Sequence, residues 1–224
     1  PTIHYDTVRG GEPELTPQDI AGALGMLSDP LAREVLCACW WPDGAQLRRS
    51  QLEDLLRQKM LAEYSRRSLQ AQMAKLEFHI AESGWLAKHA RTEHDRRALS
   101  SARTTMEAAK AEQWPWNVEV YNRIVAAVIE ELRSQHTCSH CAGRGVIVPK
   151  TIAAVTTCVR CHGSGQAPLP KTARARALGI TESAYRSVWA GAYEWTYALI
   201  SGLECDAARE LDKALGAGPH LKAA

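Results

Sequence analysis

An eight-residue pattern, Cys-x-x-Cys-x-Gly-x-Gly, occurs twice in this chain of 224 residues, first at Cys138–Gly145 and again at Cys158–Gly165. Two residues between paired thiolates let both sulfur atoms reach one metal ion, and the glycines let the backbone turn with positive φ beneath it. Two such pairs separated by sixteen residues supply a closed tetrahedral set for Zn²⁺. The predicted ligands of this structural zinc finger are Cys138, Cys141, Cys158 and Cys161.

The cysteine count favours a reducing compartment. Seven cysteines are an odd number, which does not suit a secreted disulfide framework. The first eleven residues are polar and do not resemble a secretory signal. No run approaches the roughly 18 consecutive apolar residues of a membrane span. We therefore expect a cytoplasmic protein that has no membrane partner.

The composition favours helices, because Ala, Leu, Arg, Glu and Gln are abundant and the chain has a single Phe. Thr16-Pro17 and Asp29-Pro30 each predict a helix start. Helical composition continues over 46–110, with an interruption expected at Ser83-Gly84. Four apolar residues within this stretch have helical spacing and are expected to share one face, namely Leu69, Met73, Leu76 and Ile80.

A second amphipathic helix is predicted immediately before the finger. Asn117 can cap it, and its end is expected near Gln135. Its apolar positions repeat at helical spacing and are Tyr121, Ile124, Val125, Val128 and Leu132. We expect a mainly α-helical protein with an inserted Cys₄ zinc finger and a helix-turn-helix. The expected regions are a helical N-terminal region at 1–112, a core helix at 113–135, the finger at 136–166, the helix-turn-helix at 167–204 and a C-terminal tail at 205–224.

The residues between the two knuckles suit a short β-ribbon, because 146–148 and 152–157 are rich in β-branched side chains. A histidine in place of one cysteine ligand is an alternative, since His136, His140 and His162 lie within or next to the knuckles. The basic residues around the finger are candidate phosphate contacts, namely Arg144, Lys150 and Arg160.

The segment after the finger has the pattern of a helix-turn-helix. A helix over 171–178 is followed by Gly179, which suits a turn. Ile180 then suits the core, and Thr181 suits the N-cap of a second helix. Such motifs meet DNA with the N-terminal face of the second helix. Ordinary helical hairpins carry the same pattern, so both interpretations stay open.

Helical spacing predicts the outward face of this second helix. Ala184, Tyr185 and Val188 are expected to face inward. Arg186 could bind guanine in a bidentate manner, and Glu182 could accept a hydrogen bond from cytosine. The candidate DNA-binding residues are Glu182, Ser183, Arg186 and Ser187 on this helix, with Lys171, Arg174 and Arg176 as phosphate contacts on the preceding one.

The second helix is expected to continue to about Leu203. Large apolar side chains cover more than half of its circumference, so the helix is either buried on two faces or offers one face to a partner. These side chains belong to Trp189, Tyr193, Trp195, Tyr197, Leu199 and Ile200. Docking against the helix at 121–132 is the expected arrangement.

The order of amphipathic helix, paired knuckles and an Ala-Tyr-Arg-Ser-Val helix at 184–188 resembles the Q-type antitermination proteins of lambdoid phages, in the branch that carries a zinc finger. The resemblance covers about 114–200. In that family the finger interrupts the helix-turn-helix, whereas here a complete turn at 178–181 follows the finger. The knuckles are also similar to the zinc domain of Hsp40-type chaperones, but that domain has four such repeats.

The resemblance implies a non-enzymatic function in a bacterial host cell. Proteins of this family bind a DNA element within a late promoter, engage paused RNA polymerase with its sigma factor, and make the enzyme resistant to pauses and terminators. The alternative is a zinc-finger and helix-turn-helix regulator that does not travel with polymerase. A nuclease is disfavoured, because the sequence shows no paired-carboxylate metal motif and no phosphate-binding glycine loop.

Overall fold

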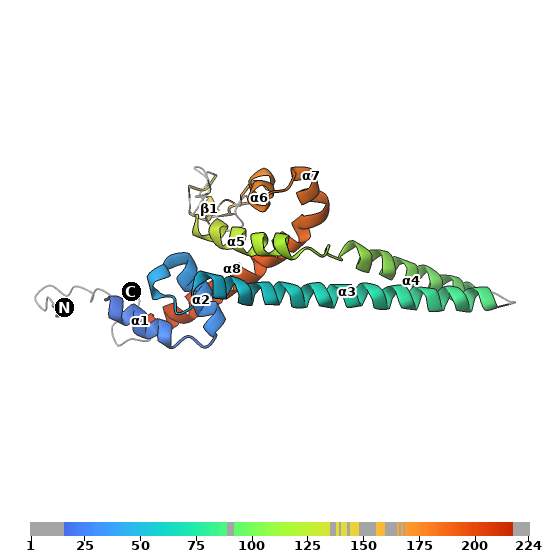
Figure 1. Ribbon diagram of the computed structural model, residues 1–224, viewed down its shortest axis with the longest axis horizontal. Helices are drawn as coiled ribbons and strands as arrows, with labels where there is room; N and C mark the ends of the chain where they lie inside the picture. Colours follow the sequence, from blue (N-terminus) through green and yellow to red (C-terminus); the bar gives the residue numbers. More distant parts are fainter. Residues whose placement is uncertain are drawn as a thin grey trace, which may run out of the picture. The chain divides into compact units, whose positions relative to one another are not determined.

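The computed structural model confirms a mainly helical protein (Figure 1). It describes residues 16–88, 92–134, 138, 140–142, 144–147, 156–159, 165, 167 and 169–216. The chain forms two compact units, one of residues 1–52 with 197–224 and one of residues 53–196. Among the described helices, none is both long enough and apolar enough to cross a membrane.

In the first unit, two short helices begin where their N-cap residues predict. Helix α1 (Pro17–Gly25) starts with a capping box between Thr16 and Asp19, and Asp29 caps helix α2 (Pro30–Trp40). The short 3₁₀ turn η1 (Pro42–Gly44) follows. The buried carboxylate of Glu34 accepts hydrogen bonds from the backbone N–H groups of Gln46 and Leu47, at 2.9 and 2.8 Å, just before the next helix begins.

The C-terminal part of helix α8 (Ala190–Gly216) completes the core of this unit. Ala207 and Leu211 of α8 pack with Leu24 of α1 and Leu36 of α2. Glu210 accepts hydrogen bonds from the backbone and hydroxyl of Ser28. The prediction of a C-terminal tail from residue 205 is therefore wrong for residues 205–216. These residues continue helix α8 and bury an apolar face.

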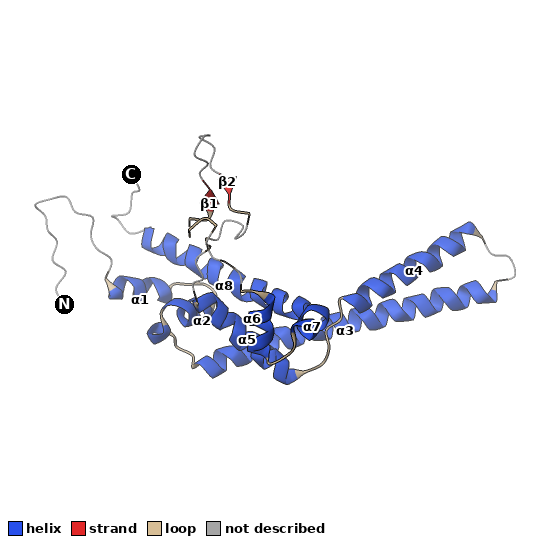
Figure 2. Ribbon diagram, turned by 90° about the horizontal axis from the view of Figure 1, so that it is seen from above, coloured by secondary structure: helices blue, strands red, loops and turns tan. Residues whose placement is uncertain are grey.

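Helices α3 (Arg49–Ala87) and α4 (Glu93–Ala111) lie side by side in the second unit and run in opposite directions (Figure 1, Figure 2). The interruption expected at Ser83-Gly84 is wrong, since α3 passes through both residues and ends at Ala87. The second helix starts at a capping box between Thr92 and Asp95 instead. An isolated glycine costs a helix only about 1 kcal/mol, which the neighbouring helix can offset.

The face of α3 that meets α4 is not the predicted apolar face. Leu69, Met73, Leu76 and Ile80 do have helical spacing, but each is between 50 and 64% exposed. In the second half of α3, covered positions also repeat at intervals of four and three, and they include Arg67, Ala71, Ala74, Phe78, Ala81 and Trp85. Three of these six residues are alanines, and α3 therefore carries two parallel stripes and packs with the one that includes Ala74.

Helix α5 (Val118–Arg133) is the core of the second unit and begins at the predicted cap, Asn117. All five of its predicted apolar positions are buried. Its Tyr121 ring meets Trp189 edge-on, with ring centroids 5.9 Å apart, and Trp195 meets Trp114 at 5.4 Å. These contacts confirm that the aromatic helix after the turn docks against α5 and the segment preceding it.

Candidate functional site

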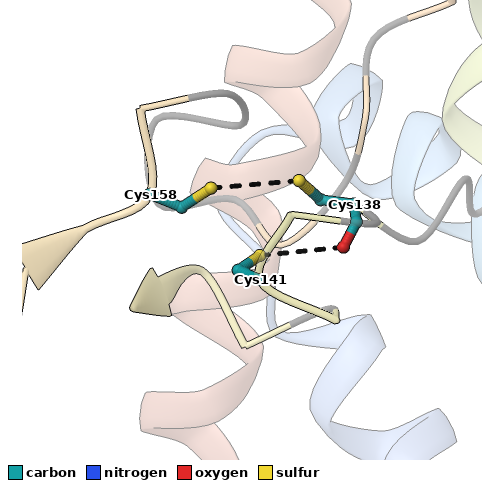
Figure 3. A group of neighbouring side chains, drawn as sticks. All are labelled: Cys138, Cys141 and Cys158. Atoms are coloured by element: carbon teal, nitrogen blue, oxygen red, sulfur yellow. Dashed lines mark hydrogen bonds between the residues drawn. The ribbon is translucent and has the colours of Figure 1, made fainter. Parts of the chain in front are cut away.

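Three of the four predicted ligand cysteines form a buried cluster. The Sγ atoms of Cys138, Cys141 and Cys158 all lie within 4.8 Å of one another (Figure 3). The Cys138 and Cys158 sulfur atoms are 3.9 Å apart, too far for a disulfide of about 2.05 Å. Four sulfur atoms at about 2.3 Å from a central ion would be about 3.8 Å apart in a regular tetrahedron. The spacing of these thiols therefore fits metal coordination.

Each knuckle is closed by a hydrogen bond to the other. The backbone N–H of Cys138 donates to the carbonyl of Gly165, and that of Cys158 donates to the carbonyl of Gly145, both at 2.8 Å. Both glycines have positive φ, 70° at Gly145 and 73° at Gly165. This exchange joins the two copies of the sequence pattern into one unit and explains why each copy ends in glycine.

A short antiparallel ribbon links the knuckles, as the β-branched residues predict. Strand β1 (Val146–Ile147) pairs with strand β2 (Thr156–Thr157), Val146 opposite Thr157 and Ile147 opposite Thr156. Cys158 follows β2 directly, and Ile147 packs on the cysteine cluster. The ribbon thus brings two half-sites that are distant in sequence to one centre.

The surroundings of the thiols favour metal uptake. The backbone N–H of Cys141 is directed at the Cys138 sulfur and lowers the pKa of that thiol, against the opposing effect of burial. A lower thiol pKa raises the fraction of thiolate, the form that binds metal. Arg144 is exposed and its Nε donates to the carbonyl of Cys141 at 3.1 Å, and His140 is exposed. The predicted residues that lie outside the described part are Cys161, Lys150, Arg160, His136 and His162.

The turn after the finger has the predicted geometry. Helix α6 (Lys171–Leu178) ends at Gly179 with a φ of 68°, and the N–H of Ile180 donates to the carbonyl of Ala175. This pair of features is a Schellman C-cap. The Thr181 hydroxyl then accepts from the N–H of Ala184 and caps helix α7 (Glu182–Ala184). Two helices joined by a tight, capped turn are therefore present.

We expect Gly179→Ala to lower the free energy of unfolding by about 1–3 kcal/mol, because a left-handed φ is costly for alanine. The added methyl would also lie 2.7 Å from Nη1 of Arg123, the group that donates to the carbonyl of Leu178 at 2.9 Å. Urea unfolding of the full chain measures the change. Gly84→Ala in α3 is the control, because the methyl group that it would add has no neighbour within 4 Å beyond the adjacent residues and backbone of its own helix. A rise of about 0.5–1 kcal/mol is expected. Equal effects of both changes would contradict the strained turn.

The chain continues from α7 without a break through the π-helical segment η2 (Tyr185–Trp189) into α8. Glu182 forms an ion pair with Arg186 across one turn, and Arg186 is largely exposed. The hydroxyl of Ser187 donates to the carbonyl of Ser183 at 2.9 Å. The structure therefore brings all four predicted residues of this helix to its first two turns, where Ser183, Arg186 and Ser187 are exposed and Glu182 is partly covered.

The expected inward position of Val188 is wrong, because this side chain is 45% exposed and Trp189 is buried instead. A π-helical segment has more residues per turn than an α-helix, and the N–H of Ala190 donates to the carbonyl of Tyr185, five residues earlier. Tyr185 and Trp189, four residues apart, are the two buried side chains here. Val188 is on the exposed face, because helical spacing puts both Val188 and Trp189 next to Tyr185 and does not select which of them is buried.

The assignment of Arg174 as a phosphate contact is also wrong. Its side chain is buried and hydrogen-bonds both carboxylate oxygens of Glu131, at 2.7 and 3.0 Å. The guanidinium lies over the ring of Tyr193 at 4.8 Å. Burial disfavours the cation, but the Glu131 carboxylate outweighs it and raises the pKa of Arg174. Lys171 and Arg176 of the same helix are exposed, as expected for residues that contact a ligand.

Comparison of the chain with protein-family models, with curated proteins and with solved structures gives no match. The site is therefore interpreted from its own residues. They form a buried three-cysteine cluster that could hold a metal ion, followed in sequence by a capped helix-turn-helix.

Proposed function

We propose that this chain is a zinc-stabilised DNA-binding protein that acts in transcription antitermination. The observation that carries the proposal is the second helix of the turn, whose first turns present the guanidinium of Arg186 and two serine hydroxyl groups. Recognition helices read base edges with such groups at their N-terminal ends. Arg186 is the candidate for a guanine, and exposed Val188 adds an apolar group that suits a thymine methyl.

The metal would be a single Zn²⁺ with a structural role. Cys161 occupies in the second knuckle the place that Cys141 has in the first, so it is the proposed fourth ligand. Four protein ligands leave no position for a catalytic water, and we infer a scaffold rather than an enzyme. Arg144 lies beside this centre and is a candidate phosphate contact, together with Lys171 and Arg176.

The antitermination function rests on the sequence resemblance over about 114–200. It implies a protein of the bacterial host cytoplasm that binds an element in a late promoter, engages paused RNA polymerase with sigma, and suppresses pauses and terminators. A net charge of only +2 is small for a protein that holds DNA by phosphate contacts alone, since each neutralised phosphate requires a cation. A second contact with polymerase would raise the effective concentration at the site.

The test uses the full zinc-loaded chain with duplex DNA selected from a random pool. We expect Arg186→Ala to weaken binding to the selected site by about 5- to 150-fold, equivalent to about 1–3 kcal/mol, and to relax preference at one base position. Arg103→Ala is the matched control, because Arg103 is also an exposed arginine paired with a glutamate four residues away on a helix. Its affinity should stay at the wild-type value.

Equal affinity of the two variants would contradict DNA recognition by this helix. Transcription through a terminator placed downstream of the selected site then separates the two regulatory functions. Readthrough that depends on the protein supports antitermination. A footprint that remains at the site after polymerase has left, without readthrough, would favour the alternative of a regulator that does not travel with the enzyme.

A further inference from the structure

Glu131 is a buried carboxylate near the C-terminal end of α5 that joins three other segments of the second unit. Its oxygens accept from the Arg174 guanidinium of α6 and, at 2.8 Å, from the Tyr193 hydroxyl of α8. Oε1 also accepts from the backbone N–H of Leu169 at 3.1 Å. Its side chain is only 3% exposed. A buried carboxylate with this many donors fixes the position of each of them.

The contact between Glu131 and Leu169 joins the segments on the two sides of the finger. Helix α5 ends at Arg133, shortly before the first knuckle, and Leu169 lies just before α6, after the second knuckle. The Glu131 side chain therefore links the helix that precedes the finger to the segment that follows it. A bound metal ion shortens the loop between these two points, which lowers the entropy cost of holding Leu169 against Glu131.

Among the described residues, two side chains of α5, Glu131 and Arg123, hydrogen-bond to α6, and Glu131 also holds the residue that follows the finger. At its N-terminal half, Arg174 pairs with Glu131, which also holds Leu169. At its C-terminal end, the carbonyl of Leu178 accepts from Arg123, one further residue of α5. The Arg123 contact includes no residue of the finger or its exit. The two attachments can therefore be separated by mutation.

We propose that Glu131 is a positioning residue that couples metal binding in the finger to the order of the helix-turn-helix. The inference rests on the proposed metal site and deepens the proposed function. Metal binding favours the closed finger, the closed finger holds Leu169 at Glu131, and Glu131 holds the support helix α6 and the helix α8. Coupling of this kind is reciprocal, so an ordered helix-turn-helix also raises the affinity for the metal.

The experiment measures amide hydrogen exchange of α6 in the full chain, with Zn²⁺ bound and after its removal by a chelator. In the wild type we expect metal removal to lower protection of 171–178 by at least about fivefold, the lower end of typical coupling between sites. In Glu131→Gln, protection should be lower in both states and change by less than about twofold on metal removal. The control Arg123→Ala should lower protection in both states yet keep the wild-type dependence on metal.

These outcomes separate coupling from a merely structural role, which would lower protection without altering its dependence on metal. An undiminished metal dependence in Glu131→Gln would overturn the proposal. If Glu131→Gln does not fold, the double variant with Arg174→Met removes the remaining buried charge and should show the same loss of coupling. A wild-type chain that binds no zinc would overturn the metal site itself, a result distinguishable by metal analysis from loss of coupling in a zinc-bound protein.

Discussion

Replacing Cys158 by serine is expected to abolish stoichiometric zinc binding and to unfold the finger. Cys158 is buried within the thiol cluster, and a serine hydroxyl does not replace a thiolate ligand. Zinc-finger peptides derive about 10–16 kcal/mol of apparent binding free energy from their metal near pH 7, so loss of a ligand removes the main stabilising contribution to this region. Metal content after dialysis against a chelator measures the effect, and Cys141→Ser should behave alike.

Cys205→Ser is the matched control, because Cys205 is an exposed thiol outside the cluster and its loss should leave one zinc ion per chain. Cys161→Ser tests the proposed fourth ligand, which lies outside the described residues. Full retention of zinc in both Cys158→Ser and Cys141→Ser would refute the thiolate site.

The second large effect is expected from Arg174→Met. This change keeps much of the apolar stem but leaves the buried Glu131 carboxylate without its cation, and removing one partner of a buried ion pair costs about 3–5 kcal/mol. The free energy of unfolding from urea titration measures it, and affinity for DNA should fall only as far as the folded fraction does.

Arg176→Ala is the control for this experiment, two residues further along the same helix and exposed. Its effect on stability should stay within about 0.5 kcal/mol. If Arg174→Met were as stable as Arg176→Ala but lost affinity for all DNA sequences evenly, Arg174 would be a phosphate contact after all.

Local features of the fold were predictable because a few neighbouring residues determine them. Thr16 and Asp29 begin helices as their side chains predict, since an N-cap satisfies backbone donors within three residues. Gly179 and Thr181 likewise end one helix and begin the next. The spacing within the first cysteine pair belongs to the same class, because one short knuckle brings the sulfur atoms of Cys138 and Cys141 to one centre.

Periodicity predicted which residues share a face but not what covers that face. On α5 the apolar stripe is the buried one, whereas on α3 the stripe that includes Leu76 is exposed and the one that includes Ala74 is covered. Both stripes of α3 repeat at intervals of four and three. Only the position of α4 in space selects between them.

The sequence by itself determined the helical class, the helix caps, the paired cysteine knuckles and the capped turn, because each depends on residues that are close together in the chain. The tertiary structure alone decided the role of Arg174, since its partner Glu131 lies 43 residues away and converts a basic residue into a buried ion pair. It also decided the exposure of Val188, because Trp189 rather than Val188 packs on the ring of Tyr121. Contacts between distant segments have no signature in local spacing, and they determine which charged side chains remain available to a partner.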